Sequence, residues 1–173
     1  MQREEALAEI GFTGAEQQLA RRLALPADAC IPLFFSIRFG GAWSFADGGI
    51  RALSVVERTT VYDETTGEGY SREVIHLCIN PVCTGREGIV RRLEKCGEEK
   101  TRFLVERPFR IRIRADRIIT AELNPARKTI ITRERSSRTI AWEGSAAAQA
   151  DHELEHLAGR TVAGGLLWEF QFL

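Results

Sequence analysis

The sequence predicts a single α+β domain, in which antiparallel strands occupy most of the chain and one clear helix follows them. Several segments alternate apolar and polar residues with the period of a strand, turn-rich stretches separate these segments, and an alanine-rich segment with helical spacing comes near the end. The 173 residues are enough for one core. With 44% hydrophobic and 28% charged residues, the composition excludes disordered and fibrous proteins.

The first half of the chain is expected to hold a short helix pair and three strands. From Arg3 to Leu25 apolar residues recur at helical spacing, and Gly11 and Gly14 interrupt the pattern. The dense apolar run "CIPLFFSIRF", residues 30–39, predicts a buried strand. The segments "IRALSVVERTTVYDE" and "EVIHLCINP" predict two more strands, because turn-rich "TTGEGYS" separates them.

The second half is expected to hold three more strands and the helix. The segment after Pro81 has no period that we can assign. The stretches "RFLVERPFRIRIRADRIITAEL", "RKTIITRER" and "RTIAWEG" then predict antiparallel strands. The helix is expected to run from Ser145, a suitable N-cap, to Gly159, a suitable residue to end it.

The charge is balanced overall and uneven along the chain. The formal net charge is zero, which gives no global attraction to nucleic acid or to an anionic membrane. From Arg102 to Arg138, however, eleven basic residues face four acidic ones, a net charge of +7. Within this stretch "RIRIR" is typical of a strand with buried isoleucines and solvated arginines, and the alternative is an edge that contacts RNA or the ribosome.

Cysteine usage and apolar runs set the expected compartment. Four irregularly spaced cysteines do not form a disulfide scaffold, so a reducing compartment is expected. The apolar runs are far shorter than the roughly 20 residues of a membrane helix. The acidic start "MQREEALAEI" is unlike a transit peptide, so an organellar presequence is not expected in this chain.

The stretch "DHELEH" carries the strongest chemical signal. His152 and His156 are four residues apart on the predicted helix, so both imidazoles face the same way and can hold one metal ion. Glu153 has the position of a general base in the HExxH pattern, and the alternative is a polar turn without metal. Residue type alone does not identify the third metal ligand. Besides carboxylates, the candidates are Cys30, Cys78, Cys83, Cys96 and His76. Among these Cys96 stands out, because the following Gly97 permits a close approach of the backbone.

With Cys96 as the third ligand, the chain resembles the peptide deformylase family. "QADHELEHLAGRTV" is similar to that family's HExDH motif, and "EKCGEE" to its EGCLS motif, with three substitutions. "INP" and "RFLVER" are similar to neighbouring family segments. "GFTGAEQQ", residues 11–18, is preferred as the GxGLAAxQ motif over the rival "GGIRALSV" from Gly48, which lacks the glutamine.

The resemblance implies antiparallel β-sheets packed around a metal-bearing HExxH helix in a single domain 1–173, with insertions near 40–70 and 124–135. It implies one divalent metal ion, usually Fe²⁺ in cells, with Zn²⁺, Ni²⁺ or Co²⁺ as alternatives. The implied metal ligands are Cys96, His152 and His156. The implied catalytic groups are Glu153 as general base, with Gln18 and Gly97 at the oxyanion. Arg102 is implied to line the substrate cleft, and Glu94 with Arg107 to support the site.

The expected function is removal of the N-formyl group from the formyl-methionine of newly made polypeptides. Two alternatives stay open. One is an inactive deformylase-like protein that binds ribosomes through the basic 102–138 stretch. The other is a different zinc hydrolase with another third ligand. The expected location is the bacterial cytoplasm or an organelle such as the mitochondrion.

Overall fold

The computed structural model describes residues 11–96, 99–160, 164–166, 170–171 and 173. Its helices are α2 (Gly14–Arg22), the 3₁₀ helix η1 (Ala27–Cys30), α3 (Ile31–Phe39) and α4 (Gly144–Leu157). Its strands are β1 (Trp43–Asp47), β2 (Ile50–Asp63), β3 (Glu68–Ile79), β4 (Val82–Glu87), β5 (Val90–Glu94), β6 (Phe103–Arg107), β7 (Arg110–Arg114), β8 (Arg117–Asn124), β9 (Thr129–Glu134), β10 (Thr139–Glu143) and β11 (Gly165–Leu166).

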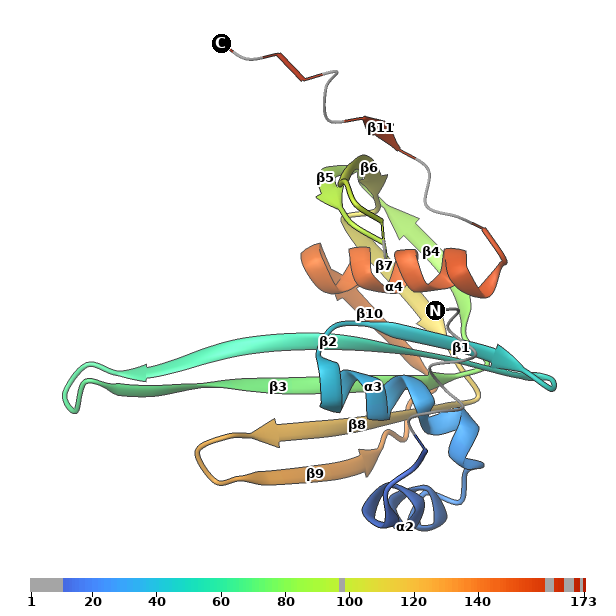
Figure 1. The fold of residues 1–173 in the computed structure, drawn as a ribbon, viewed down its shortest axis with the longest axis vertical. Coiled ribbons are helices and arrows are strands. Elements are labelled where there is room, and N and C mark those ends of the chain that lie inside the picture. Colours follow the sequence, from blue (N-terminus) through green and yellow to red (C-terminus); the bar gives the residue numbers. More distant parts are fainter. Residues whose placement is uncertain (1–10, 97–98, 161–163, 167–169, 172) are drawn as a thin grey trace.

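The strands form three antiparallel sheets. The largest has the order β1-β2-β3-β8-β9, and two smaller sheets have the orders β10-β7-β4 and β11-β6-β5. The long hairpin of β2 and β3 extends beyond the rest of the molecule, with β9 at the free edge of the large sheet (Figure 1). Hairpins join β1 to β2, β2 to β3, β8 to β9 and β5 to β6. The pairings of β3 with β8, of β7 with β4 and β10, and of β11 with β6 join strands that are distant in the sequence.

Helices cover both faces of the five-stranded sheet. Along β2, Ala52 and Val56 belong to a core shared with α2, η1 and α3, whereas Leu53 and Val55 belong to a core shared with α4, β7 and β10. This division follows from the period of a strand, whose successive side chains point to opposite faces. We call these the α3 face and the α4 face.

The predicted strand over residues 30–39 is wrong, because this run forms η1 and the helix α3. Pro32 stands in the first turn of α3, where its missing N–H costs nothing, and Gly40 ends the helix at φ 74°. The residues from Ile31 to Ser36 are all buried, so polar residues do not recur along this run at the spacing of a helix. A continuously apolar segment does not distinguish a buried helix from a buried strand.

Other expected elements are present. The stretches from Ile50 and from Glu73 lie in β2 and β3, and the predicted helix is α4, which begins one residue before Ser145. The long stretch from Arg102 contains three strands, β6, β7 and β8, instead of one. The first helix of the expected N-terminal pair falls largely in residues 1–10, outside the described residues, and the second is α2.

The predicted α+β class, with sheets packed around a metal-bearing helix, is wrong. The described chain is mostly antiparallel β, with three α-helices on the faces of its sheets. The single-domain organisation and the insertions near 40–70 and 124–135 stay predictions. None of the described helices is long and apolar enough to cross a membrane.

Candidate functional site

Helix α4 positions the candidate site because one of its sides is made of small residues. Ala147, Ala150 and Leu154 pack into the core of the α4 face against β2, β7 and β10. Alanine favours the helix and lets the backbone approach the sheet closely. The polar residues of "DHELEH" are thereby held at fixed positions beside the sheets.

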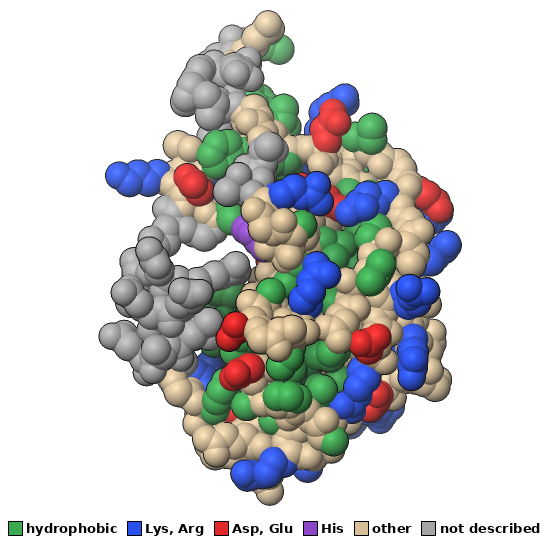
Figure 2. Space-filling view, turned by 90° about the vertical axis from the view of Figure 1, so that its right-hand side faces the viewer, with side chains coloured by type: hydrophobic (Ala, Val, Ile, Leu, Met, Phe, Trp, Pro, Cys, Tyr) green, Lys and Arg blue, Asp and Glu red, His purple; other side chains and the backbone are tan. Residues whose placement is uncertain are grey.

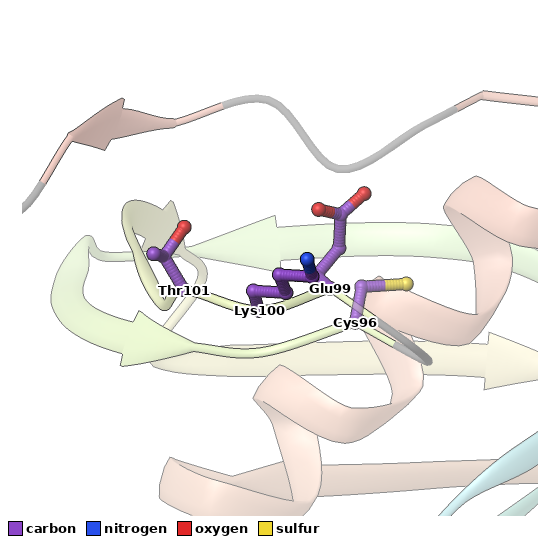
Figure 3. A pocket seen from close by; sticks show the side chains of 4 residues that line it. All are labelled: Cys96, Glu99, Lys100 and Thr101. Atoms are coloured by element: carbon purple, nitrogen blue, oxygen red, sulfur yellow. The ribbon is translucent and has the colours of Figure 1, made fainter.

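Two of these positions, His152 and His156, bring their imidazoles together with the thiol of Cys96. The Cys96 Sγ lies 3.2 Å from the His156 Nε2, and the two histidine Nε2 atoms are 2.9 Å apart. All three ligand atoms lie within 4.8 Å of one another, so by donor type and spacing this group can hold a metal ion. Cys96 comes from the segment after β5, and its sulfur points toward α4 (Figure 3).

A buried arginine underlies this group. Arg107, on β6, is 3% exposed and donates to both oxygens of Glu94 at 2.8 to 3.2 Å. The same guanidinium lies 3.0 Å from carboxylate oxygens of both Asp151 and Glu155. One cation therefore holds three acidic groups from β5 and α4, which fixes the strand and the helix relative to each other.

Glu94 links this arginine to the imidazoles. Its Oε2 lies 2.9 Å from the Nδ1 of His152, so the other ring nitrogen of His152 faces Cys96 and His156. Burial favours a raised pKa for Glu94, but hydrogen bonds from His152 and Arg107 outweigh burial and lower this pKa to about 2. Glu94 is consequently ionised at neutral pH. Burial acts to lower the pKa of Arg107, and its bonds to Glu94 outweigh this and raise it.

Glu153 occupies a different side of α4. It is 4% exposed and stands one helical turn after Gln149. The Gln149 carboxamide accepts from the Val56 N–H at 3.0 Å and donates to the Val56 carbonyl at 3.1 Å. Because residues four apart share a helix face, Glu153 lies on the face that Gln149 turns toward the sheet.

A shallow hollow opens next to the thiol. Its volume is about 420 Å³, and Cys96, Glu99, Lys100 and Thr101 line it (Figure 3). Arg102 is exposed and immediately follows this segment. The rim of the hollow therefore carries both charges.

The other predicted site residues are not brought to this cluster. Gln18 is exposed on α2, which packs on the α3 face, across the sheet from α4. Gly97 lies outside the described residues. Cys30 and Cys78 are buried, and burial raises their pKa values to about 11 and about 12. His76 instead contacts Glu57 at 2.6 Å.

The basic stretch does not form a uniform patch. Arg107 is buried, Arg110 binds Glu87 and Glu143, and Arg117 binds Glu134. Figure 2 shows Lys and Arg side chains mixed with Asp and Glu over the face that it presents. Sequence reasoning missed the roles of Arg86, which bonds Asp151 at 2.8 Å, and of Gln149. The i, i+4 spacing of Asp151 and Glu155 was the available signal for a shared cation.

Comparison with known protein families gives a match. The model of a family described as RimB-like, retropepsin-like aspartic endopeptidase RimB, matches residues 14–134. No curated protein and no solved structure matches the chain. The mostly antiparallel β architecture is consistent with a retropepsin-like fold.

The match corrects several predictions from the sequence. The assignment to the peptide deformylase family is wrong, and with it the deformylase activity, since the matching family is one of aspartic endopeptidases. The expected divalent metal cofactor, iron or a substitute, is also wrong, because aspartic peptidases use carboxyl groups in place of a metal. The alternative of an inactive ribosome-binding protein has no support from the match. The short HExxH pattern misled because a motif of this length occurs in unrelated contexts.

Proposed function

The chain belongs to the RimB-like family, and from this premise we propose that it is an endopeptidase in which the Asp47 carboxyl group takes part in the hydrolysis of peptide bonds. Aspartic peptidases use a pair of acidic groups that share one proton. The observation that carries the proposal is the position of Asp47. Among the aspartates within the matched residues 14–134, it combines an exposed carboxylate that no described residue is seen to bind with a place at the end of a strand, next to a tight turn.

The other aspartates within the matched residues are less suitable. Asp63 accepts from the backbone of its own turn at Thr65, and Asp116 accepts from Asn80 at 2.8 Å. Asp28 is exposed on η1, which packs on the α3 face. Asp63 and Asp116 are therefore tied to local structure, and Asp28 is not on a strand.

Asp47 is presented by a tight hairpin. It ends β1 opposite Ile50, and Gly48 and Gly49 connect the strands with φ values of 55° and 83°. Such left-handed values suit a two-residue turn whose twist matches the strands, and glycine adopts them without strain. The turn leaves the Asp47 carboxylate exposed and without a partner among the described residues.

The strand register places Asp47 on the α3 side of the sheet. Asp47 pairs with Ile50, and Ile50 packs with Ala52 in the core of the α3 face. Residues directly opposite on antiparallel strands direct their side chains to the same face. Glu153 lies on α4, across the sheet, so it is not assigned to the catalytic pair.

The proposed chemistry is general acid–base catalysis. One carboxylate takes a proton from water as the water oxygen attacks the peptide carbonyl, and the protonated partner gives a proton to the departing amine. Glu94, Asp151 and Glu155 do not serve as the acid, because all three bind Arg107. In this proposal Glu94 and Arg107 position α4.

The test is cleavage of an unfolded protein. Casein is incubated with the full chain between pH 3 and pH 8, and new N-termini are identified by mass spectrometry. We expect internal cleavage that Asp47→Asn reduces by at least about 100-fold. The matched controls, Asp28→Asn and Asp63→Asn, are expected to retain activity, with unchanged circular dichroism in all three variants.

Metal removal separates this mechanism from metal-dependent hydrolysis. Prolonged chelation is expected to leave the casein activity unchanged, since no step uses the Cys96, His152 and His156 group. The proposal fails if the wild-type chain does not cleave casein, if Asp47→Asn stays active, or if chelation abolishes the activity.

A further inference from the structure

We propose that β9 is a self-association surface, at which a second copy of this chain adds its own β9 in antiparallel orientation. The two five-stranded sheets would then form one continuous sheet. The inference rests on the unpaired backbone groups and the exposed isoleucines of β9. It is independent of the peptidase chemistry.

Strand β9 is a regular edge strand. Its six residues pair with β8 without a register shift, and β8 is its neighbour in the sheet. All six side chains are exposed or half-buried. Figure 1 shows β9 at the free edge of the sheet, so one side of its backbone is available for pairing.

The backbone groups on that free side can be identified. The Arg135 N–H donates to the Ile118 carbonyl at 2.8 Å, so the odd-numbered residues of this strand bond to β8. In an antiparallel strand, the N–H and carbonyl groups of successive residues point alternately to the two sides. Those of Ile130, Thr132 and Glu134 therefore point outward, away from β8. These groups form the donor and acceptor row that another strand requires.

The edge lacks the usual protection. Proline, lysine and β-bulges discourage pairing at sheet edges, and the segment 129–134 contains none of them. Ile130 is 51% exposed and Ile131 is 46% exposed. At the opposite edge of the sheet, by contrast, the Gln149 carboxamide satisfies the Val56 backbone where β1 no longer covers β2.

The segment is also complementary to itself. With a two-fold axis through Ile131, the two copies of Ile131 lie opposite each other, and Ile130 exchanges backbone bonds with Thr132 of the second copy. The same register sets Lys128 opposite Glu134 of the second copy, so opposite charges meet at both ends of the added pair. A second copy of this chain is therefore the occupant that fits.

The test measures the mass of the full chain by sedimentation velocity over a range of concentrations. We expect a dimer of twice the 19.4 kDa chain mass. Thr132→Pro removes an outward N–H and leaves the bonds to β8, and Ile131→Lys sets two like charges against each other. Each variant is expected to raise the dimer dissociation constant at least about tenfold.

The matched control is Val61→Lys, since Val61 is 43% exposed on β2 of the same sheet and lies away from β9. It is expected to leave the dissociation constant unchanged. Hydrogen exchange gives a direct readout, because the amides of Ile130, Thr132 and Glu134 are expected to exchange more slowly as concentration rises. The proposal is overturned by a wild-type chain that stays monomeric to about 1 mM, or by a dimer that Val61→Lys weakens and Thr132→Pro does not.

Discussion

The two faces of the five-stranded sheet are covered in different ways. On the α3 face the core is apolar, with Phe34 and Leu33 against the sheet, and its buried polar groups are hydroxyls such as Ser36 and Ser54, 2.7 Å apart. The α4 face adds buried ions, with Arg107 and Glu94 beside the helix. Burial of a charge costs several kcal/mol, which hydrophobic packing avoids. The difference indicates that the α4 face is shaped to hold polar side chains in place, whereas the α3 face supplies stability.

Removal of the central cation is the strongest way to test this difference. Arg107→Leu leaves Glu94, Asp151 and Glu155 close together without their shared partner. We expect a loss of about 4 kcal/mol in the free energy of unfolding, measured with urea. Adding Glu94→Leu and Asp151→Leu to the same chain is expected to recover part of this loss. A loss below about 1 kcal/mol, as for an exposed ion pair, would show that burial of these charges does not make their loss costly.

A cavity on the α3 face gives the matching test of apolar packing. Leu33 is fully buried, so Leu33→Ala is expected to lower the free energy of unfolding by about 3 kcal/mol. Because Leu33 is buried in the core and Asp47 is exposed at the turn between β1 and β2, cleavage of casein by the folded fraction is expected to stay unchanged. A loss of activity that exceeds the loss of folded protein would link this core to the turn that carries Asp47.

The extent to which sequence predicts each face also differs. Strands β2 and β3 follow from alternation and turns, and in β7 the isoleucines are buried and most of the arginines exposed, as "RIRIR" indicates. Helix α3 was taken for a strand because burial on every side removes the period. On the α4 face, the i, i+4 spacing is enough to place His152 beside His156. The junction with Arg107 joins β5, β6 and α4, so no local pattern contains it.

The family was harder to predict than the local geometry. The signal of "DHELEH" lies in residues 151–156, and the matched family segment ends at residue 134. Asp47 escaped notice because an aspartate before two glycines is the ordinary composition of a hairpin turn. Its meaning depends on the family match, which no local pattern around the turn contains.

Acid is expected to weaken the α4 face selectively. The pKa of Glu94 is about 2 in the folded chain against 4.5 as its ordinary value, so its contribution to stability is fully present above pH 4.5. This contribution is lost progressively as the pH falls from 4.5 through 2, and roughly 2.5 kcal/mol of it is lost by pH 2.5. Urea unfolding at pH 6, 4 and 2.5 measures it. Glu94→Gln is the control, and a variant with the same acid sensitivity as the wild-type chain would assign the effect to other carboxylates.

The smallest effect is expected at the start of α2, on the α3 face. The Thr13 hydroxyl accepts from the Glu16 N–H at 3.2 Å, and the Glu16 carboxylate accepts from the Thr13 N–H at 2.9 Å. Thr13→Ala removes one half of this reciprocal cap and is expected to cost about 1 kcal/mol, while Thr13→Ser retains it. Glu16 also binds Arg38 of α3, so Glu16→Ala is expected to cost more than Thr13→Ala. Equal losses in urea unfolding would mean that the link between α2 and α3 adds nothing, and that apolar contacts alone hold the helices of this face together.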